Sequence, residues 1–433
     1  MKIAIPYGRS SMEIDVPDDR LLAVLRPTEP DGAPEDFVLQ RAIVERALAN
    51  PVASPPLRRL ASGRSRATVI TSDHTRPVPS RITLPPLLEE MRADNASLEV
   101  TLLVATGMHR PTTADELGER LGPSILSRER VVVHDARCDD DLRFLGKLPS
   151  GGDLWVNRFA VETDLLVAEG FIEPHFFAGF SGGRKSVLPG VAGYRTVLAN
   201  HCASFIASPR ARAGSLDGNP IHADMLFAAE AARLAFILNV ALDGKKRIRA
   251  AWAGHFDEAH RRGCADVARS AAVDGRRKAP IVVTSNGGYP LDQNVYQAVK
   301  GMTAAEALCS DGGVIIAVAA CEDGHGGQAF FDALAGAASP RELLDRIGGR
   351  PMEETEPDQW EYQILARILN RVEVIVVSDR CPPELFEAIH LRWAPTFERA
   401  LAMAEERTGP DADILVVPDG VAVVVETARE ASR

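Results

Sequence analysis

The sequence predicts an α/β protein of two domains, each built on a mainly parallel sheet flanked by helices. Short apolar stretches alternate with helical ones along the first part of the chain, which is the pattern of a parallel sheet with crossover helices. The alternation starts again after a polar, basic stretch, GRRKAP at 275–280. We therefore expect a first domain over residues 1–274 and a second, smaller one over 275–433, with a last helix that can dock on either domain.

The strands are expected where apolar, often β-branched runs lie between turn signals. In the first domain these runs are RATVITSD (66–73), LEVTLLVATG (98–107), RVVVHDA (130–136), DLLVAEG (164–170) and LAFILNVAL (234–242). In the second domain they are PIVVTSNGG (280–288), GVIIAVAA (313–320), VEVIVVSD (372–379) and DILVVPDG (413–420). Open sheets of this kind bind ligands beyond the carboxyl ends of their strands.

The composition indicates a soluble enzyme that acts on a small molecule. A net charge of -11 leaves no basic face to neutralise phosphates, so nucleic acid is not an expected partner. Six cysteines occur without a CxxC pair, which indicates reduced thiols and argues against a zinc ribbon. The N-terminus lacks the basic start and apolar stretch of an export signal, and no apolar run is long enough to span a membrane. We expect a cytoplasmic protein without membrane contact.

Polar segments follow four of the predicted strands in the first domain. Such turns would meet at one edge of the sheet, and together they indicate a binding site more strongly than any one of them alone. The segments are SDHTRPVPS (72–80), TGMHRPTT (106–113), HDARCDDD (134–141) and EPHFFAGFSGGRKS (173–186).

The glycine-rich turn GFSGGRKS at 179–186 suits an anion, because glycine lets the backbone approach a phosphate closely. It is not a P-loop, since Arg184 stands where that motif requires glycine before Lys185. A plain glycine turn with a surface lysine is the alternative. In the segment at 72–80, Arg76 would hold a carboxylate or phosphate through two contacts, whereas Asp73 would serve equally well as a helix N-cap.

His109 and His175 follow different strands, and two imidazoles around one substrate can act as acid and base on opposite faces. That arrangement suits a racemase or epimerase, although either histidine alone would more often be structural. His201 lies on a predicted helix where a neutral imidazole can ligate a metal. Because position 205 is Phe, a zinc site of several protein ligands is poorly supported.

The second domain offers a helix in YPLDQNVYQAVKGM at 289–302. Tyr296, Gln297 and Lys300 take adjacent helical positions and would reach a carboxylate across a cleft between the domains. Trp360 would wall the same cleft. A solvated helix and a tryptophan packed on a neighbouring helix are the alternatives.

In order along the chain, SDHTRPVPS, TGMHRPTT, EGFIEPHFFAGFSGGRKSVLPGVAGYRTVLANH and YQAVKG resemble the nickel-pincer-nucleotide lactate racemase family. The resemblance covers most of the chain, and the long block is its most specific part. It implies two α/β domains with the active site in the cleft between them. It also implies racemisation or epimerisation of 2-hydroxy acids, lactate or a related short-chain acid, by hydride transfer to and from a pyridinium mononucleotide that binds nickel through one carbon and two sulfurs.

The resemblance also implies roles for individual residues. Lys185 would carry the cofactor through a thioamide, and His201 would be the protein ligand of nickel. His109 and His175 would be the acid/base pair. The cofactor would also contact the turn Asp73, His74, Thr75 and Arg76, and the substrate would contact Arg76, Tyr296, Gln297, Lys300 and Trp360. Enzymes that make the cofactor would be needed as maturation partners.

Two other classes of function remain open at this point. A metal-dependent hydrolase or dehydratase would use Asp73, His109 and His175 around a simple metal ion. A nucleotide-binding regulator would use the turn at 179–186 without turnover.

Overall fold

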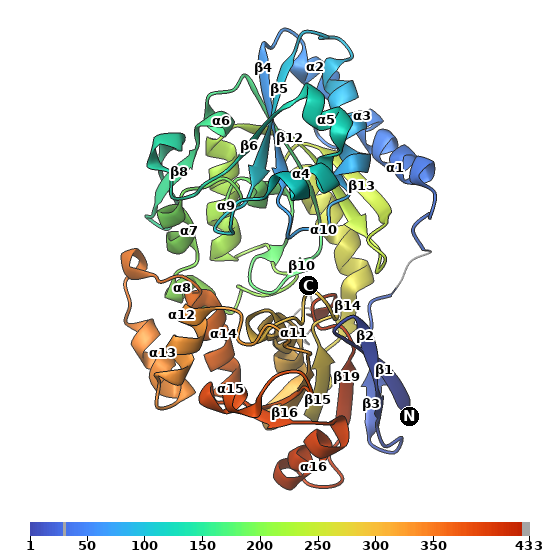
Figure 1. Cartoon of the computed structure of the whole chain (residues 1–433), viewed down its shortest axis with the longest axis vertical. Coiled ribbons are helices and arrows are strands. Elements are labelled where there is room, and N and C mark those ends of the chain that lie inside the picture. The colour runs from blue at the N-terminus through green and yellow to red at the C-terminus, as the bar shows by residue number, and fades with distance from the viewer. Residues whose placement is uncertain (29–31, 427–433) are drawn as a thin grey trace.

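The computed structural model describes residues 1–28 and 32–426 and confirms the predicted α/β class with mainly parallel sheets flanked by helices (Figure 1). The first sheet has the strand order β13-β12-β9-β4-β5-β6, and only the β12–β13 pair is antiparallel. Its strands are β4 (Arg66–Ser72), β5 (Glu99–Ala105), β6 (Arg130–Val133), β9 (Leu165–Phe171), β12 (Leu234–Leu242) and β13 (Ile248–Gly254).

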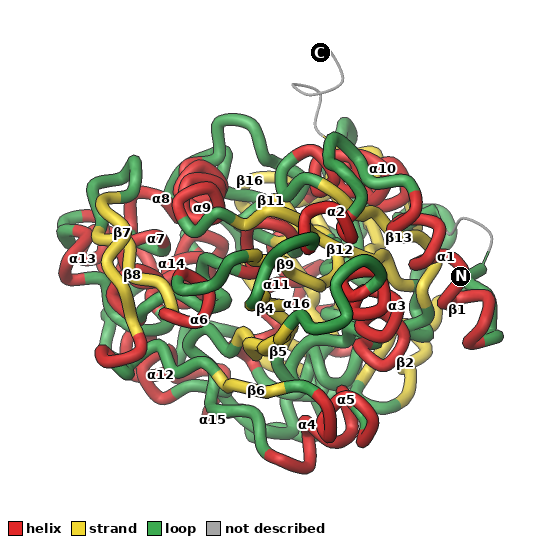
Figure 2. Tube along the Cα trace, turned by 90° about the horizontal axis from the view of Figure 1, so that it is seen from above, coloured by secondary structure: helices red, strands yellow, loops and turns green. Residues whose placement is uncertain are grey.

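Helices cover both faces of the first sheet, as the view from above shows (Figure 2). Alternate residues of each strand face opposite ways, so Val69 packs with the α1–α3 side and Ile70 with the α6–α9 side. The helices of this part are α1 (Phe37–Ala49), α2 (Leu57–Ala61), α3 (Ser80–Arg92), α4 (Ala114–Leu121), α5 (Pro123–Arg128), α6 (Arg158–Val161), α7 (Tyr194–Asn200), α8 (Ala203–Ile206), α9 (Pro220–Ala231) and α10 (Glu258–Ala271). Two small hairpins, β7 (Leu142–Lys147) with β8 (Asp153–Asn157) and β10 (Pro174–His175) with β11 (Gly179–Phe180), complete it.

The second sheet is parallel throughout, with the order β18-β17-β16-β15-β19-β3. Its strands are β3 (Leu21–Val24), β15 (Ala279–Ser285), β16 (Cys309–Val318), β17 (Glu373–Val377), β18 (Arg392–Ala394) and β19 (Ile414–Val417). Its helices are α11 (Val295–Leu308), α12 (Gln328–Ala335), α13 (Pro340–Gly348), α14 (Gln359–Leu369), α15 (Pro383–Ala388) and α16 (Phe397–Thr408).

The first strands of the chain lie on the second sheet and not on the first. β3 pairs with β19, and the hairpin of β1 (Lys2–Tyr7) and β2 (Ser10–Asp15) buries Ile5 and Ile14 against the second sheet. The sequence assigned residues 1–24 to the first domain, because nothing local distinguishes a strand that pairs with its neighbour from one that pairs across the chain. The predicted boundary at residues 274 and 275 stays a prediction.

The described chain enters the first sheet after β3 and returns to the second sheet between α10 and β15. At the crossing, β14 (Ala272–Asp274) pairs in parallel with β20 (Val424–Glu426). The predicted docking of the last helix concerns residues 427–433, which lie outside the described part of the chain. Within the described part, no helix is long and apolar enough to cross a membrane.

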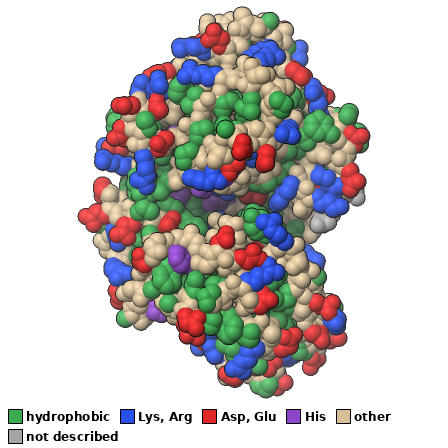
Figure 3. Space-filling model, in the orientation of Figure 1, with side chains coloured by type: hydrophobic (Ala, Val, Ile, Leu, Met, Phe, Trp, Pro, Cys, Tyr) green, Lys and Arg blue, Asp and Glu red, His purple; other side chains and the backbone are tan. Residues whose placement is uncertain are grey.

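One core cluster runs through both parts, from Met225 on α9 through Ile206 on α8 to Leu365 on α14. The two parts are therefore packed together along one side. On the face shown in Figure 3 the surface is hollowed between them, and histidine side chains line the hollow.

Candidate active site

Three of the predicted polar turns meet because strands β9, β4 and β5 are neighbours in the sheet. Asp73 follows β4, His109 follows β5, and the segment 173–186 follows β9. The fourth turn follows the edge strand β6 and bonds to other segments: His134 Nε2 lies 3.0 Å from the Ala192 carbonyl oxygen, and the Tyr194 amide donates to the Ala136 carbonyl at 2.8 Å.

Asp73 holds His109 directly. The Asp73 side chain is 1% exposed, and its Oδ2 lies 2.7 Å from His109 Nδ1. Its Oδ1 accepts a bond of 2.7 Å from the Thr75 hydroxyl. Burial raises the pKa of Asp73, but the His109 bond and the charges of His109 and Arg76 outweigh it and leave that pKa below its ordinary value. The alternative reading of Asp73 as a helix N-cap is wrong, because α3 begins at Ser80 behind Pro79.

The segment 173–186 is held from behind by Arg184, whose side chain is fully buried. Its guanidinium donates to the carbonyls of Ala178 at 2.7 Å and Phe180 at 2.8 Å, and to His222 Nδ1 at 2.9 Å. It also lies 3.1 Å from His260 Nε2. All these bonds of Arg184 are made to the loop and to the residues behind it, whereas the next side chain, Lys185, contacts His175.

Glycine is required at two positions of this turn. Gly182 has φ +77°, and a Cβ there would lie 2.7 Å from both Asn239 Oδ1 and the Phe171 carbonyl oxygen. Gly183 has φ +53°, and its Cβ would lie 2.6 Å from the His260 ring. The backbone can approach its neighbours this closely only without a side chain.

Lys185 and His175 face each other at 3.2 Å between Nζ and Nε2. The amide of Ala178 donates to His175 Nδ1 at 3.3 Å, so the proton of a neutral ring is on Nε2. Nε2 then donates to Lys185 Nζ, which must be an uncharged amine to accept. Burial together with the charges of Arg184, Arg76 and Lys300 lowers the pKa of Lys185 well below its ordinary value, in agreement with that geometry. Burial and Lys185 lower the pKa of His175 as well.

His201 closes helix α7 with one nitrogen engaged and one free. Its Nδ1 lies 2.9 Å from the Val197 carbonyl and donates to it, so Nε2 presents a lone pair. Burial and the nearby Lys185 lower the pKa of His201 to about 3, which keeps the ring neutral. Phe177 at 5.1 Å and Trp360 at 5.0 Å, between ring centroids, hold the ring from two sides.

The second domain brings its predicted residues to the same place. Trp360 on α14 contacts His201 and donates to the Tyr296 hydroxyl at 3.2 Å. On α11, Lys300 Nζ donates to Gln297 Oε1 at 2.5 Å and lies 5.8 Å from the centroid of the Phe176 ring. The predicted substrate contacts of the second domain therefore border the predicted cofactor lysine and nickel ligand.

Five of the predicted side chains are close enough to influence one another's charges: Arg76, His175, Lys185, His201 and Lys300. Beside the uncharged Lys185 amine, Arg76 and Lys300 are the basic members of this group, which therefore favours an anionic ligand. His74, by contrast, lies at Thr112 Oγ1 with 3.1 Å between them and 3.8 Å from Glu116. The structure thus places His74 against the segment that leads into α4, away from this group.

Sequence reasoning missed the residues that support the loop, namely His222, His260 and Asn239. Asn239 Oδ1 accepts from the Gly183 amide at 2.7 Å, and Ser181 O lies 2.8 Å from His260 Nε2. These residues stand 38–79 positions from the loop residues that they contact and carry no local signal. The pairing of β12 with β9 is what brings Asn239 to the glycine turn.

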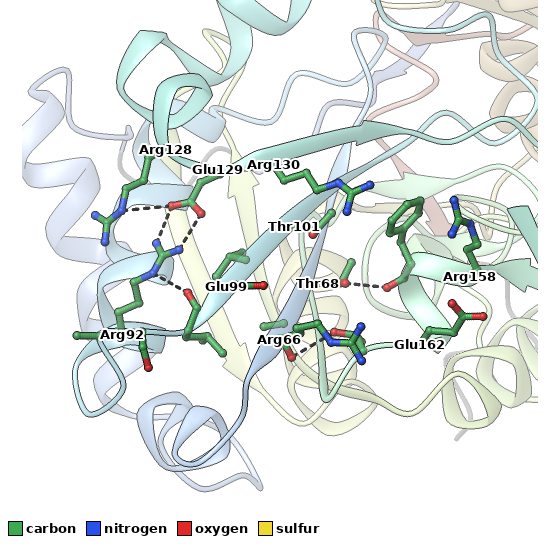
Figure 4. A pocket seen from close by; sticks show the side chains of 17 residues that line it. Arg66, Thr68, Arg92, Glu99, Thr101, Arg128, Glu129, Arg130, Arg158 and Glu162 are labelled. Carbon is green, nitrogen blue, oxygen red and sulfur yellow. Dashed lines mark hydrogen bonds and ion pairs between the residues drawn. The ribbon is translucent and has the colours of Figure 1, made fainter.

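In the described residues no three His, Cys, Asp or Glu side chains gather so as to hold a metal ion. A second hollow, of about 580 Å³, lies at the opposite edge of the first sheet, where β4, β5 and β6 begin (Figure 4). There Arg92 pairs with Glu129 through two bonds of 2.6 and 2.8 Å. None of the predicted site residues lines it.

Comparison with known proteins agrees with this geometry. The lactate racemase N-terminal domain model matches residues 7–214, and the lactate racemase C-terminal domain model matches residues 275–425. The chain is similar to the lactate racemase of Thermoanaerobacterium thermosaccharolyticum, with 51% identity over 98% of this chain and 99% of that one. It is 46% identical to the lactate racemase of Lactiplantibacillus plantarum over the same shares of the two chains.

The structure of the lactate racemase apoprotein from T. thermosaccharolyticum superimposes with a TM-score of 0.95, covering 98% of this chain and all of that one. A protein from Thermotoga maritima, 19% identical, shares the fold with a TM-score of 0.67 over 92% of this chain. Two domain models in the expected order, and two relatives near half identity along almost the whole length, establish that this chain belongs to the lactate racemase family of isomerases.

Proposed function

We propose that the protein racemises or epimerises a 2-hydroxy acid, lactate or a related short-chain acid, with a nickel-pincer nucleotide tethered to Lys185. The uncharged Lys185 amine beside His175 carries the proposal, because an amine must be deprotonated to form a covalent bond with the cofactor. The lactate racemases to which the chain is similar name the substrate class to test first.

The residues present suit this cofactor. His201 offers one buried, neutral imidazole nitrogen, which is enough for a nickel ion whose other ligands come with the nucleotide. The basic group around Arg76 suits its phosphate. The turn at Gly182 and Gly183 leaves no room for side chains beside the tethering lysine. When bound, the nickel-pincer nucleotide would accept a hydride from the substrate and return it. Its synthesis requires separate maturation enzymes.

The protein side chains supply the rest of the reaction. The α C–H of a 2-hydroxy acid is far too weak an acid for histidine to remove as a proton, so the histidines act on the hydroxyl group. One of His109 and His175 takes the hydroxyl proton as the 2-keto acid forms, and the other returns a proton after the ketone has turned over. Asp73 orients His109 for this role. Lys300 and Arg76 hold the carboxylate, and Tyr296, Gln297 and Trp360 border it.

The test is chiral chromatography of single-enantiomer 2-hydroxy acids, D- and L-lactate first, after incubation with protein co-produced with the cofactor-making enzymes. We expect the opposite enantiomer to appear without net loss of acid. If protein whose intact mass shows the adduct inverts no acid in the panel, a short-chain 2-hydroxy acid is not the substrate, and sugar acids become the next class to assay.

Lys185→Ala separates this proposal from the metal-dependent hydrolase. The variant is expected to lose both the added mass and the activity, because no other amine stands at that position. Lys278→Ala, at an exposed lysine, is the matched control and should keep the adduct. Activity of Lys185→Ala restored by a simple metal ion would contradict the proposal.

A further inference from the structure

Helix α14 carries a buried carboxyl group that has no role in the proposed reaction. Glu361 is 0% exposed, and neither of its carboxyl oxygens has a hydrogen-bond partner in the described part of the chain. A carboxylate buried in this way is costly unless a nearby opposite charge compensates it. Glu361 follows Trp360 on α14, and α14 packs against α11. The buried carboxyl group therefore lies on the side of the cleft that carries the proposed substrate contacts.

The basic group whose charge acts on Glu361 is Lys300 of α11. Burial raises the pKa of Glu361 to about 8, Lys300 lowers it, and Asp358 raises it. In the other direction, burial lowers the pKa of Lys300, and Glu361 is the strongest of the charges that oppose this. The two groups therefore titrate as a pair across the α11–α14 contact.

Lys300 has little other support for its charge. Its hydrogen-bond acceptor is the neutral Gln297 amide, and within the described chain it forms no ion pair at 4 Å or less. The other charged groups around Lys300 come from the first domain. Arg76 lowers the pKa of Lys300, and Glu173 raises it by less than Glu361 does. Lys185 and His175 are its basic neighbours. Once Glu361 has lost its proton, it is thus the principal counter-charge for Lys300.

We propose that Glu361 is a positioning residue that keeps Lys300 charged, so that the cleft continues to bind a substrate carboxylate as the pH rises. At neutral pH, Glu361 holds a proton, which explains how its oxygens tolerate burial. When the pH rises, the first proton of the pair leaves Glu361, and the new negative charge retains the ammonium proton of Lys300. The inference rests on the proposed function for its use, but the pairing itself does not.

The pairing can be tested on the protein without its cofactor. Competitive labelling with trace acetic anhydride, followed by peptide mass spectrometry over a range of pH, measures where Lys300 loses its proton. In Glu361→Gln we expect this midpoint to fall by about one pH unit. Glu361→Asp should restore part of the shift, because it keeps the carboxyl group. Glu384→Gln removes an exposed carboxylate on α15 and should change nothing. An unchanged Lys300 midpoint in a folded Glu361→Gln protein would overturn the inference.

A second measurement uses the wild-type protein and needs no variant: carbon-detected NMR of the glutamate carboxyl groups. Glu361 is expected to titrate near pH 8. Titration of Glu361 together with the exposed glutamates would also overturn the proposal.

In the cofactor-loaded enzyme, Glu361→Gln should move the alkaline limb of kcat/KM to lower pH by the same amount. At neutral pH, KM should change less than about threefold, whereas in the alkaline range it should rise about tenfold. A merely structural role would lower kcat at every pH without moving the limb. If the loaded wild type inverts no 2-hydroxy acid, the proposed function fails while the Lys300 titration still decides the pairing.

Discussion

At the scale of single residues, the contact between Asp73 and His109 shows how far sequence reasoning reaches. The sequence indicated that Asp73 and His109 follow strands that are consecutive along the chain, and the sheet order makes these strands neighbours. It could not decide between a helix cap and a histidine partner for Asp73, because both uses need the same short carboxylate. The 2.7 Å contact decides it.

Asp73→Asn is expected to lower kcat by about 10²–10⁴-fold in the loaded enzyme, because an amide no longer selects the His109 tautomer or stabilises its protonated form. Steady-state racemisation kinetics measure the loss. Thr75→Val removes the hydroxyl bond of 2.7 Å to Asp73 Oδ1 and the longer contact of 3.4 Å between that hydroxyl and His109 Nδ1. It leaves the bond between Asp73 and His109 in place, so its effect should stay within about tenfold. Equal losses in both variants would mean that Asp73 acts through the turn and not through His109.

At the scale of elements, the sequence indicated that the segment 173–186 forms a site, but it did not indicate which residues hold this segment in place. Glycines, a lysine and two phenylalanines beside a histidine are visible in the sequence. The role of Arg184 depends on His222 and His260, which reach it from α9 and α10. A residue whose partners are 38 and 76 positions away is indistinguishable, in the sequence, from a second basic group in the site.

Gly183→Ala is expected to destabilise the protein by about 1–3 kcal/mol, because the new methyl group meets the His260 ring and the backbone is left-handed there. The displaced turn should also reduce the fraction of protein that carries the cofactor. Thermal unfolding and intact mass measure the two effects. Gly118→Ala, in helix α4 with nothing within 4 Å, is the control and should be neutral or stabilising by up to about 1 kcal/mol. Full cofactor loading in Gly183→Ala would contradict this account of the turn.

At the scale of the whole molecule, four histidines are buried and have a pKa below the ordinary value: His134, His201, His222 and His260. In each case burial is the main cause, because it disfavours the charged ring. The unfolded chain therefore binds more protons than the folded one below about pH 6.5. The contribution of these four histidines to stability is complete above that pH, and it is lost as the pH falls toward their pKa values in the folded protein.

This makes acid sensitivity a measurable property of single sites. The pKa of His222 is lowered to about 3, so its neutral form contributes about 2 kcal/mol that is lost between pH 7 and pH 5. Urea unfolding at the two values should show that His222→Asn loses about 2 kcal/mol less than the wild type over this interval. The same substitution at His255, whose side chain is 40% exposed, should leave the difference as it is. An unaltered pH difference in His222→Asn would show that the ring is protonated in the fold.

The overall architecture could be predicted where the strands have a clear sequence pattern. The run at 280–288 predicts β15, and the run at 413–420 predicts β19, because both are apolar and bounded by turns. The place of β3 beside β19 did not follow, since a four-residue edge strand carries no mark of its partner. Periodicity in the sequence indicates which residues are buried. It does not indicate which strands pair, because a pairing across almost four hundred residues depends on the tertiary structure.

That pairing has a consequence for how the protein is made. A ribosome delivers β3 early, whereas β19, its partner, ends at Val417. At about 5–20 residues per second, the first strands wait on the order of 20–80 s for their sheet. Residues 21–24 therefore cannot pair in the second sheet until β19 has been made, and a factor that shields emerging chains would have to cover them over that interval.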